Sequence, residues 1–123
     1  MNQTMGDFTA ITNDWIDAWN EHDLDRIMSH YSDDIEYVAN TVFSRWHKPD
    51  GKLQGKEELR EHFRLALLVA PQLRFTLKNV FSAPHGYAFH YERENGNHVL
   101  NVVELDVMGL MKKAQVFYSG EQK

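Results

Sequence analysis

Cysteine is absent from the 123 residues, and only three prolines interrupt the chain. Without cysteine there are no disulfides, thiolate nucleophiles or zinc-finger ligands, and the redox character of the compartment stays open. Long apolar runs are missing too. The longest, residues 65–71, is far shorter than a membrane span, and the first residues lack the basic and apolar segments of a signal peptide. We therefore expect a cytoplasmic protein that engages no membrane.

Clusters of basic residues are also lacking. The net charge is -5, and the 13 Lys and Arg residues are scattered along the chain. Binding to a phosphate backbone requires grouped positive charges, so we expect no nucleic-acid partner. The length accommodates one domain, residues 1–123, and no internal repeat is visible.

Three helices are predicted in the first half of the chain. The first carries an apolar stripe, is capped by Thr4 and runs to about Asn20, and a short second helix is capped by Asp23. The third opens at Gly55 and is stopped by Pro71. The stripes that these helices would bury are Phe8, Ile11, Trp15, Ala18 and Trp19, then Leu24, Ile27, Met28 and Tyr31, and finally Leu59, Phe63, Ala66 and Leu67.

The alternation of apolar and polar residues predicts strands at 35–39, 73–82, 86–94, 98–107 and 110–119. Asn95-Gly96 is a strong hairpin signal, and Pro84-His85-Gly86 and Met108-Gly109 mark the other two reversals. The turn at Pro49-Asp50-Gly51 suggests a loose hairpin across residues 40–54. Helices followed by a meander indicate an α+β domain whose helices pack on one face of a bent sheet that encloses a cavity.

A family resemblance emerges from several segments: a tryptophan-bearing helix, Asn20-Glu21-His22-Asp23-Leu24-Asp25, Tyr31-Ser32-Asp33-Asp34 and Gly55-Lys56-Glu57-Glu58-Leu59. Together they resemble the nuclear-transport-factor-2-like superfamily, in its SnoaL-like and ketosteroid-isomerase-like branches. The resemblance implies a cone: a curved, mainly antiparallel sheet wrapped around three helices of the N-terminal half, a cystatin-like α+β barrel with a pocket open at one end. Members include enzymes and binding modules, so the fold alone does not assign an activity.

A ketosteroid-isomerase-like mechanism needs a carboxylate base on the first strand and an oxyanion hole made by a tyrosine and a protonated aspartic acid. The resemblance puts Ala39 at the base position, Trp15 at the tyrosine position and Asn101 at the acid position. Ala39 cannot accept a proton, and an indole N–H only donates. This disfavours the isomerase mechanism, although Asn40 is adjacent and a shift of one residue would bring it to the base position.

Asn101 is the most informative single position. Val99 and Val103 share its strand face, so its amide is expected to point into an apolar cavity. Two interpretations stay open: a buried amide paired with a neighbouring group, or an amide that orients a ligand carbonyl. Trp15 and Trp19 likewise belong either to the core or to a ligand shelf, and Trp46 and His47 either close the pocket mouth or lie exposed on a loop.

Metal-binding motifs are missing. None of the seven histidines forms a His-x-His or His-Glu-x-x-His pattern, so we expect no metal and no cofactor, with most of the histidines solvated. An acid–base enzyme of this superfamily would draw on His47, His90, Glu92 or Glu104, with Tyr37, Tyr87 and Tyr91 as donors, and none is singled out. On strand 86–94 we expect the aromatic residues inward and His90 and Glu92 outward.

The sequence therefore predicts a SnoaL-like protein that binds a small apolar or aromatic molecule with one polar handle. A cofactor-independent isomerase, cyclase or dehydratase acting by proton transfer is the alternative, and the catalytic residues are unknown. We expect Leu100, Val102 and Tyr118 on the outer sheet face to form a homodimer. The expected pocket lining is Trp15, Trp19, Tyr37, Phe63, Leu67, Phe89, Tyr91, Val99, Asn101, Val103 and Phe117.

Overall fold

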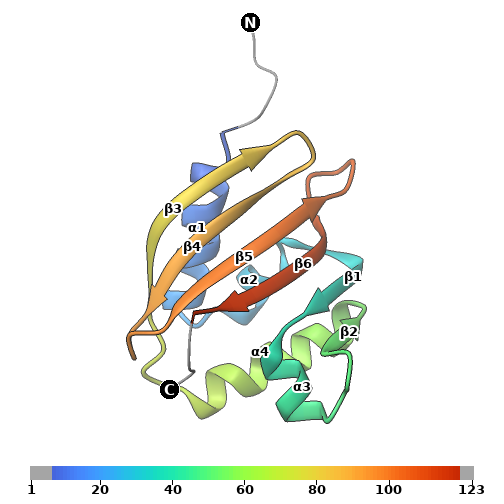
Figure 1. Cartoon of the computed structure of the whole chain (residues 1–123), viewed down its shortest axis with the longest axis vertical. Helices are drawn as coiled ribbons and strands as arrows, with labels where there is room; N and C mark the ends of the chain where they lie inside the picture. Colours follow the sequence, from blue (N-terminus) through green and yellow to red (C-terminus); the bar gives the residue numbers. More distant parts are fainter. Residues whose placement is uncertain (1–6, 120–123) are drawn as a thin grey trace, which may run out of the picture.

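A computed structural model describes residues 7–119 (Figure 1). These residues form four helices and six strands, with the helices confined to the first 69 residues and the last four strands following one another directly. In order, the elements are α1 (Thr9–Asn20), α2 (Leu24–Met28), β1 (Tyr31–Val38), α3 (Asn40–Trp46), β2 (Lys52–Gln54), α4 (Lys56–Val69), β3 (Phe75–Ala83), β4 (Gly86–Arg93), β5 (His98–Leu105) and β6 (Met111–Tyr118).

The six strands form one sheet in the order β2-β1-β6-β5-β4-β3. Every neighbouring pair is antiparallel except β1 and β6, which are parallel. The sheet is curved but open, because its edge strands β2 and β3 do not pair with each other. Register shifts at three of the pairings, such as that between Leu77 and Asn79 on β3, help the strands to bend. The predicted α+β fold with a curved, mainly antiparallel sheet is confirmed.

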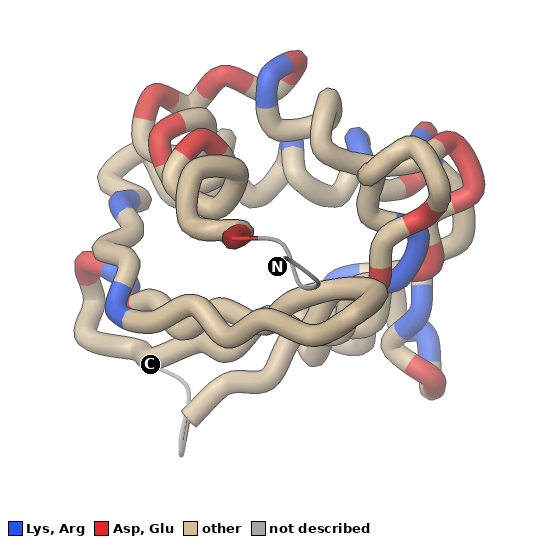
Figure 2. The backbone as a smooth tube through the Cα atoms, turned by 90° about the horizontal axis from the view of Figure 1, so that it is seen from above, with Lys and Arg blue, Asp and Glu red and all other residues tan. Residues whose placement is uncertain are grey.

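The helices cover one face of the sheet and leave the other bare (Figure 2). The α1 helix packs against β3, and α4 packs against β1. Between helix and sheet lies an aromatic core centred on Trp15, whose ring meets Phe89 at 4.8 Å, edge to face, and Tyr91 at 5.5 Å. Tyr87, Phe89 and Tyr91 all point inward, which confirms the predicted face of strand β4.

Helix starts agree with the prediction in part. Asp23 caps α2, accepting a hydrogen bond from the backbone N–H of Arg26. The predicted cap Thr4 lies outside the described residues. The α1 helix begins at Thr9, whose N–H donates to the carboxylate of Asp7. No described helix is long and apolar enough to cross a membrane.

The hairpin predicted across residues 40–54 is wrong in its first half, where α3 forms instead, so the described part of the chain has four helices rather than the three predicted. Val42 is fully buried and anchors this short helix, which ends where His47 turns to a left-handed φ of 56°. The following Lys48–Gly51 turn is present, closed by a 2.9 Å bond from Gly51 N–H to the Lys48 carbonyl. Only then does β2 pair with β1. The α3 segment has seven residues and only one buried side chain, so its sequence shows too little helical periodicity for the helix to be predicted.

Strand ends also shift. The first strand starts at Tyr31 rather than at residue 35, and β5 stops at Leu105 rather than at 107. Val107 is fully exposed at the tip of the last hairpin. Its apolar side chain extended the alternating pattern beyond the point where the chain leaves the sheet.

Candidate functional site

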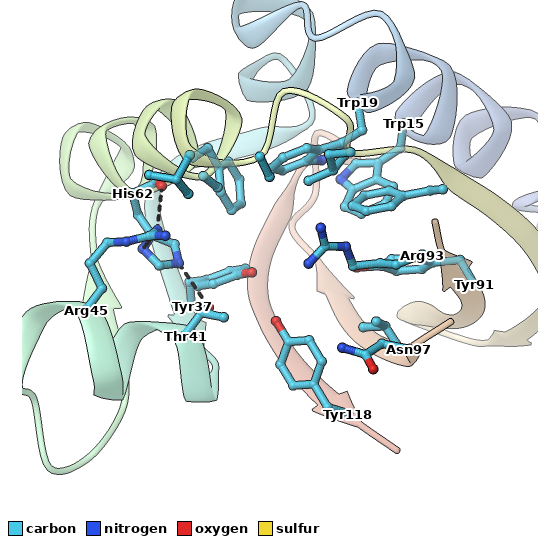
Figure 3. Close-up of a pocket in the computed structure, with 17 residues that line it drawn as sticks. Trp15, Trp19, Tyr37, Thr41, Arg45, His62, Tyr91, Arg93, Asn97 and Tyr118 are labelled. Atoms are coloured by element: carbon cyan, nitrogen blue, oxygen red, sulfur yellow. Dashed lines mark hydrogen bonds between the residues drawn. The ribbon is translucent and has the colours of Figure 1, made fainter. Parts of the chain in front are cut away.

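A cavity of about 260 Å³ lies between the helices and the inner face of the sheet (Figure 3). Its wall draws on α1, α3 and α4 from one side and on β1 and the strands β3 to β6 from the other. Aromatic rings dominate the wall, with polar groups from Thr41, Arg45, His62, Arg93 and Asn97 converging on it. A larger but shallower hollow beside Val102 has no Phe, Tyr or Trp in its wall. A concave pocket with a mainly apolar wall and a few converging polar groups is the usual form of a ligand site.

Six of the predicted pocket residues line this cavity. They come from five different elements of the chain, which the fold brings together around one space. These residues are Trp15, Trp19, Tyr37, Phe63, Tyr91 and Val99.

The other five predicted residues do not line it. Phe89, Asn101 and Val103 point inward but are buried in packed core, and Leu67 is half-buried on α4. Phe117 faces the opposite way, with 46% of its surface exposed on the outer side of the sheet.

Tyr118 occupies the place predicted for Phe117. In the β5–β6 register Tyr118 lies opposite the buried Val99, while Phe117 lies opposite Leu100 on the outer face. The prediction put Tyr118 outside and Phe117 inside, and the structure reverses both. Ala114, Val116 and Tyr118 follow the two-residue period of the inner face, and this period outweighs the greater hydrophobicity of Phe117.

A polar cluster on α3 and α4 was missed by the sequence analysis. His62 is only 2% exposed, and it and His30 are the two buried histidines among the described residues, where most histidines were expected to be solvated. The Nδ1 atom of His62 accepts hydrogen bonds from Arg45 Nη1 and from Trp46 Nε1, each at 3.1 Å. Leu59, His62, Phe63 and Ala66 share one helical face, so the helical period held a signal that could have placed His62 inside.

These contacts determine the protonation of His62. Both groups facing Nδ1 are obligatory donors, so Nδ1 carries no proton and the neutral ring carries its hydrogen on Nε2. That N–H points to the hydroxyl oxygen of Thr41 at 3.2 Å. Burial, and then the charge of Arg45, lower the pKa of His62 to about 4. At neutral pH the ring therefore presents a donor, and its basic nitrogen is blocked.

Other wall groups are donors as well. The indole Nε1 of Trp19 is buried and has no hydrogen-bond partner. Burial raises the pKa of Tyr37 and of Tyr91 well above the ordinary value, and it also raises the pKa of Tyr118, so all three phenols stay protonated at neutral pH. Within the described residues, the lining contains no aspartate or glutamate.

The β4–β5 hairpin contributes a second arginine. Arg93 extends its guanidinium into the cavity in Figure 3, close to Asn97 and Tyr118. Its Nη2 donates to Glu94 at 2.8 Å, while its Nε is buried without a partner. Arg45 and Arg93 thus approach the same space from different elements.

The three positions implied by the ketosteroid-isomerase resemblance do not assemble a catalytic site. Trp15 donates through Nε1 to the hydroxyl of Tyr31 at 3.0 Å, deep in the core. Ala39 is a buried methyl group, and Asn101 is 1% exposed with an Oδ1 that has no partner. Asn101 is therefore neither the paired amide nor the cavity-facing amide that the sequence suggested.

The acid–base candidates are also dispersed. His47 and Glu104 are exposed, and Glu104 pairs with Lys112 at 3.2 Å. His90 and Glu92 lie outward as predicted, where His90 Nε2 contacts His98 Nδ1 at 2.9 Å. Trp46 is partly exposed and reaches His62 from outside the lining. Within residues 7–119, no group of three or more His, Asp or Glu is placed to hold a metal ion.

The sequence profile of the SnoaL-like domain matches residues 12–114. A SnoaL-like protein of unknown function from Burkholderia thailandensis shares 34% identity over 90% of this chain and 92% of its own, with a TM-score of 0.87. A proposed isomerase of the SnoaL-like family from Agrobacterium tumefaciens shares 20% identity over 90% and 96%, with a TM-score of 0.69.

A protein of unknown function with a cystatin-like fold from Methylobium petroleophilum shares 16% identity over 93% of this chain and 76% of its own, with a TM-score of 0.69. At 20% and 16% identity the last two likenesses concern the fold alone. No protein of curated function matches the sequence. From the domain match and the 34% identical relative, the chain belongs to the SnoaL-like family, within the nuclear-transport-factor-2-like fold.

Proposed function

We propose that this SnoaL-like protein binds a small, mostly apolar molecule in the cavity between α1, α4 and the sheet. The cavity volume of about 260 Å³ is slightly below the usual range of ligand pockets, about 300–1,000 Å³, and this favours a compact ligand of one or two rings. Trp15, Trp19 and Phe63 offer flat apolar surfaces to such rings.

The indole N–H of Trp19 carries this proposal. The residue is 4% exposed, lines the cavity and leaves its N–H without a partner. A buried donor left unpaired costs about 1–3 kcal/mol. The nitrogen has almost no surface open to the empty cavity, so a ligand acceptor would satisfy this donor after a small turn of the indole ring, and the ligand's rings would cover the aromatic wall. The polar handle predicted for the ligand is therefore a hydrogen-bond acceptor.

Proton-transfer catalysis is the alternative, as an isomerase, cyclase or dehydratase without a cofactor. The 20% identical isomerase-named relative raises this possibility, but the wall argues against it. An abstracting base near neutral pH is needed, and Ala39 leaves the usual base position empty. The basic nitrogen of His62 is blocked, and the tyrosines are protonated donors. Such a wall can polarise a carbonyl, but it offers no residue to remove a proton.

The proposal includes a homodimer formed through the outer sheet face. All described helices lie on the other side of the sheet, so within residues 7–119 no helix covers this face (Figure 2). Phe81, Val102 and Phe117 are exposed there, at 56%, 41% and 46%. A second copy related by two-fold symmetry would cover all three residues, since an isologous interface uses the same patch twice.

A thermal-shift screen tests the binding proposal. Small polyketide-like and terpenoid compounds are added to the wild type. Steroids are included to test whether ligands of four rings are too large for the cavity. A ligand at 100 times its Kd stabilises the folded state by about 2.7 kcal/mol, which raises the Tm by several degrees. Ala66→Trp fills the cavity and should abolish the shift, while Leu68→Trp, on the exposed side of the same helix, should retain it. Equal shifts in both variants would place the ligand elsewhere. If none of the compounds stabilises the wild type, the proposal is contradicted.

A further inference from the structure

We infer that the ligand of this cavity is an anion, a small aromatic or apolar carboxylate whose charge is met by Arg45 and Arg93. The inference rests on the proposed ligand-binding function and specifies its polar handle. Four observations support it: the charges of the wall, the pairing of the arginines, the donor character of the remaining groups, and the direction of the Arg93 side chain.

The charge of the wall is positive. Two arginines line the cavity, and no carboxylate does among the residues that the structure describes. His62 is neutral at pH 7, so it does not change the positive charge of the wall. The chain as a whole carries a net charge of -5, so this positive site contrasts with the acidic character of the molecule. An anion that enters the cavity meets the guanidinium of Arg45, which has no carboxylate partner, and that of Arg93, which shares its charge with Glu94. Both guanidiniums are partly buried, which strengthens the attraction relative to bulk water.

Arg45 is the uncompensated charge. Within residues 7–119 most arginines, namely Arg26, Arg60, Arg64 and Arg93, have a carboxylate partner. The other two are Arg74, which is exposed to water, and Arg45, which is half-buried. Arg45 is held by the Nδ1 atom and by the backbone carbonyl of His62, each 3.1 Å from Nη1. A half-buried guanidinium without a counter-ion, fixed at the wall of a pocket, is the arrangement that an anionic ligand completes.

The donors around the arginines match the same ligand. Arg93 uses Nη2 for Glu94 and keeps its buried Nε unpaired, and the guanidinium extends into the cavity in Figure 3. The buried Trp19 indole is a further unpaired donor. An ionised carboxylate only accepts, at about four lone-pair positions, so it suits a wall of donors better than an alcohol or an amide, which must also place a proton.

The experiment compares two probes of one shape, 2-naphthoate and 2-naphthamide, by isothermal titration calorimetry at pH 7. The wild type is expected to bind the carboxylate at least tenfold more tightly than the amide. Arg45→Met and Arg93→Met keep the length of the side chain and remove its charge. Each should weaken carboxylate binding at least tenfold and change amide binding less than twofold, while the exposed Arg74→Met should change neither.

The outcomes separate this inference from the function on which it rests. Equal affinity for the two probes, or a carboxylate preference that survives in both pocket variants, would overturn the anionic ligand and leave a neutral-ligand pocket standing. Binding of neither probe would overturn the pocket as well. Circular dichroism of each variant checks that the two substitutions leave the fold intact, and if one variant unfolds, the other still decides the question.

Discussion

Arg45 and His62 form a fixed pair, with Nη1 of the guanidinium donating to Nδ1 of the buried imidazole at 3.1 Å. Because a guanidinium is always protonated, the imidazole must be the acceptor and must stay neutral. This relationship makes His62 a pH-sensitive element of the fold. It also turns the cation of Arg45 toward the pocket wall rather than toward a carboxylate.

Acid should destabilise the protein partly through His62. The folded-state pKa is about 4, below the ordinary value of 6.5, so as pH falls through 6.5 the unfolded chain binds the proton first. The free energy of unfolding should fall between pH 6.5 and about 4, by up to about 3 kcal/mol from this group. His62→Gln keeps an acceptor for Arg45 and cannot titrate, so urea denaturation across this range should give a flatter profile. His30, whose pKa is also lowered, remains in both proteins. Superimposable pH profiles of the two proteins would show that His62 does not cause the loss of stability in acid.

Asn101→Leu should stabilise the fold. The Oδ1 atom of Asn101 is buried without a partner, and a leucine of similar size removes that unpaired acceptor. We expect the free energy of unfolding to rise by about 1 kcal/mol in chemical denaturation. Since Asn101 does not line the cavity, a ligand should stabilise this variant as much as the wild type. A marked loss of stability would mean that the amide has a partner in solution.

Gly86→Ala should be strongly destabilising. A Cβ atom at Gly86 would meet the carbonyl oxygen of Val103 at 2.0 Å, and a backbone atom within the sheet cannot move aside. We expect a loss of about 4 kcal/mol or no folded protein, against about 1 kcal/mol for Gly109→Ala. Gly109 has a φ of +83° but open space around its Cβ position, so it isolates the backbone cost from the clash. Thermal denaturation followed by circular dichroism should rank the two variants, and the reverse order would refute the close β4–β5 contact.

Charge on the bare sheet face should separate the proposed dimer. Val102→Lys and Phe117→Lys place ammonium groups in the exposed apolar patch, where burial of an unpaired charge is costly. Light scattering after size exclusion should give twice the monomer mass for the wild type and the monomer mass for the variants. Leu68→Lys, exposed on α4 on the helix side of the sheet, should remain dimeric. A monomeric wild type would contradict the dimer.

The periodic parts of the chain were predictable because their patterns are long. Two tryptophans on one helical stripe and three aromatic residues alternating on β4 each repeat a simple spacing, and the helix and the strand face follow from them. The α3 helix has only seven residues, and one buried Val42 sets no period. Short elements of this kind are determined by the tertiary packing around them.

The site was harder to predict than the fold. Much of its apolar wall was predicted from the helical and strand patterns. Its polar chemistry comes from Arg45, His62 and Arg93, which lie on three different elements and were not predicted. A charged residue at the end of a short helix or strand looks solvated in the sequence, because nothing local says what it faces. Phe117 and Tyr118 differ by one position, and such a slip exchanges the two faces of a strand.

A ligand site beside α1 can be detected through the indole N–H signals of the three tryptophans in a ¹H–¹⁵N correlation spectrum. Trp15 donates to Tyr31 and Trp46 donates to His62, while Trp19 is unpaired at the cavity wall. Titration with 2-naphthoate should shift the Trp19 signal saturably and further than the other two, and Ala66→Trp should abolish that shift. An unmoved Trp19 signal, or equal shifts in the filled variant, would contradict a ligand site between the first helix and the sheet.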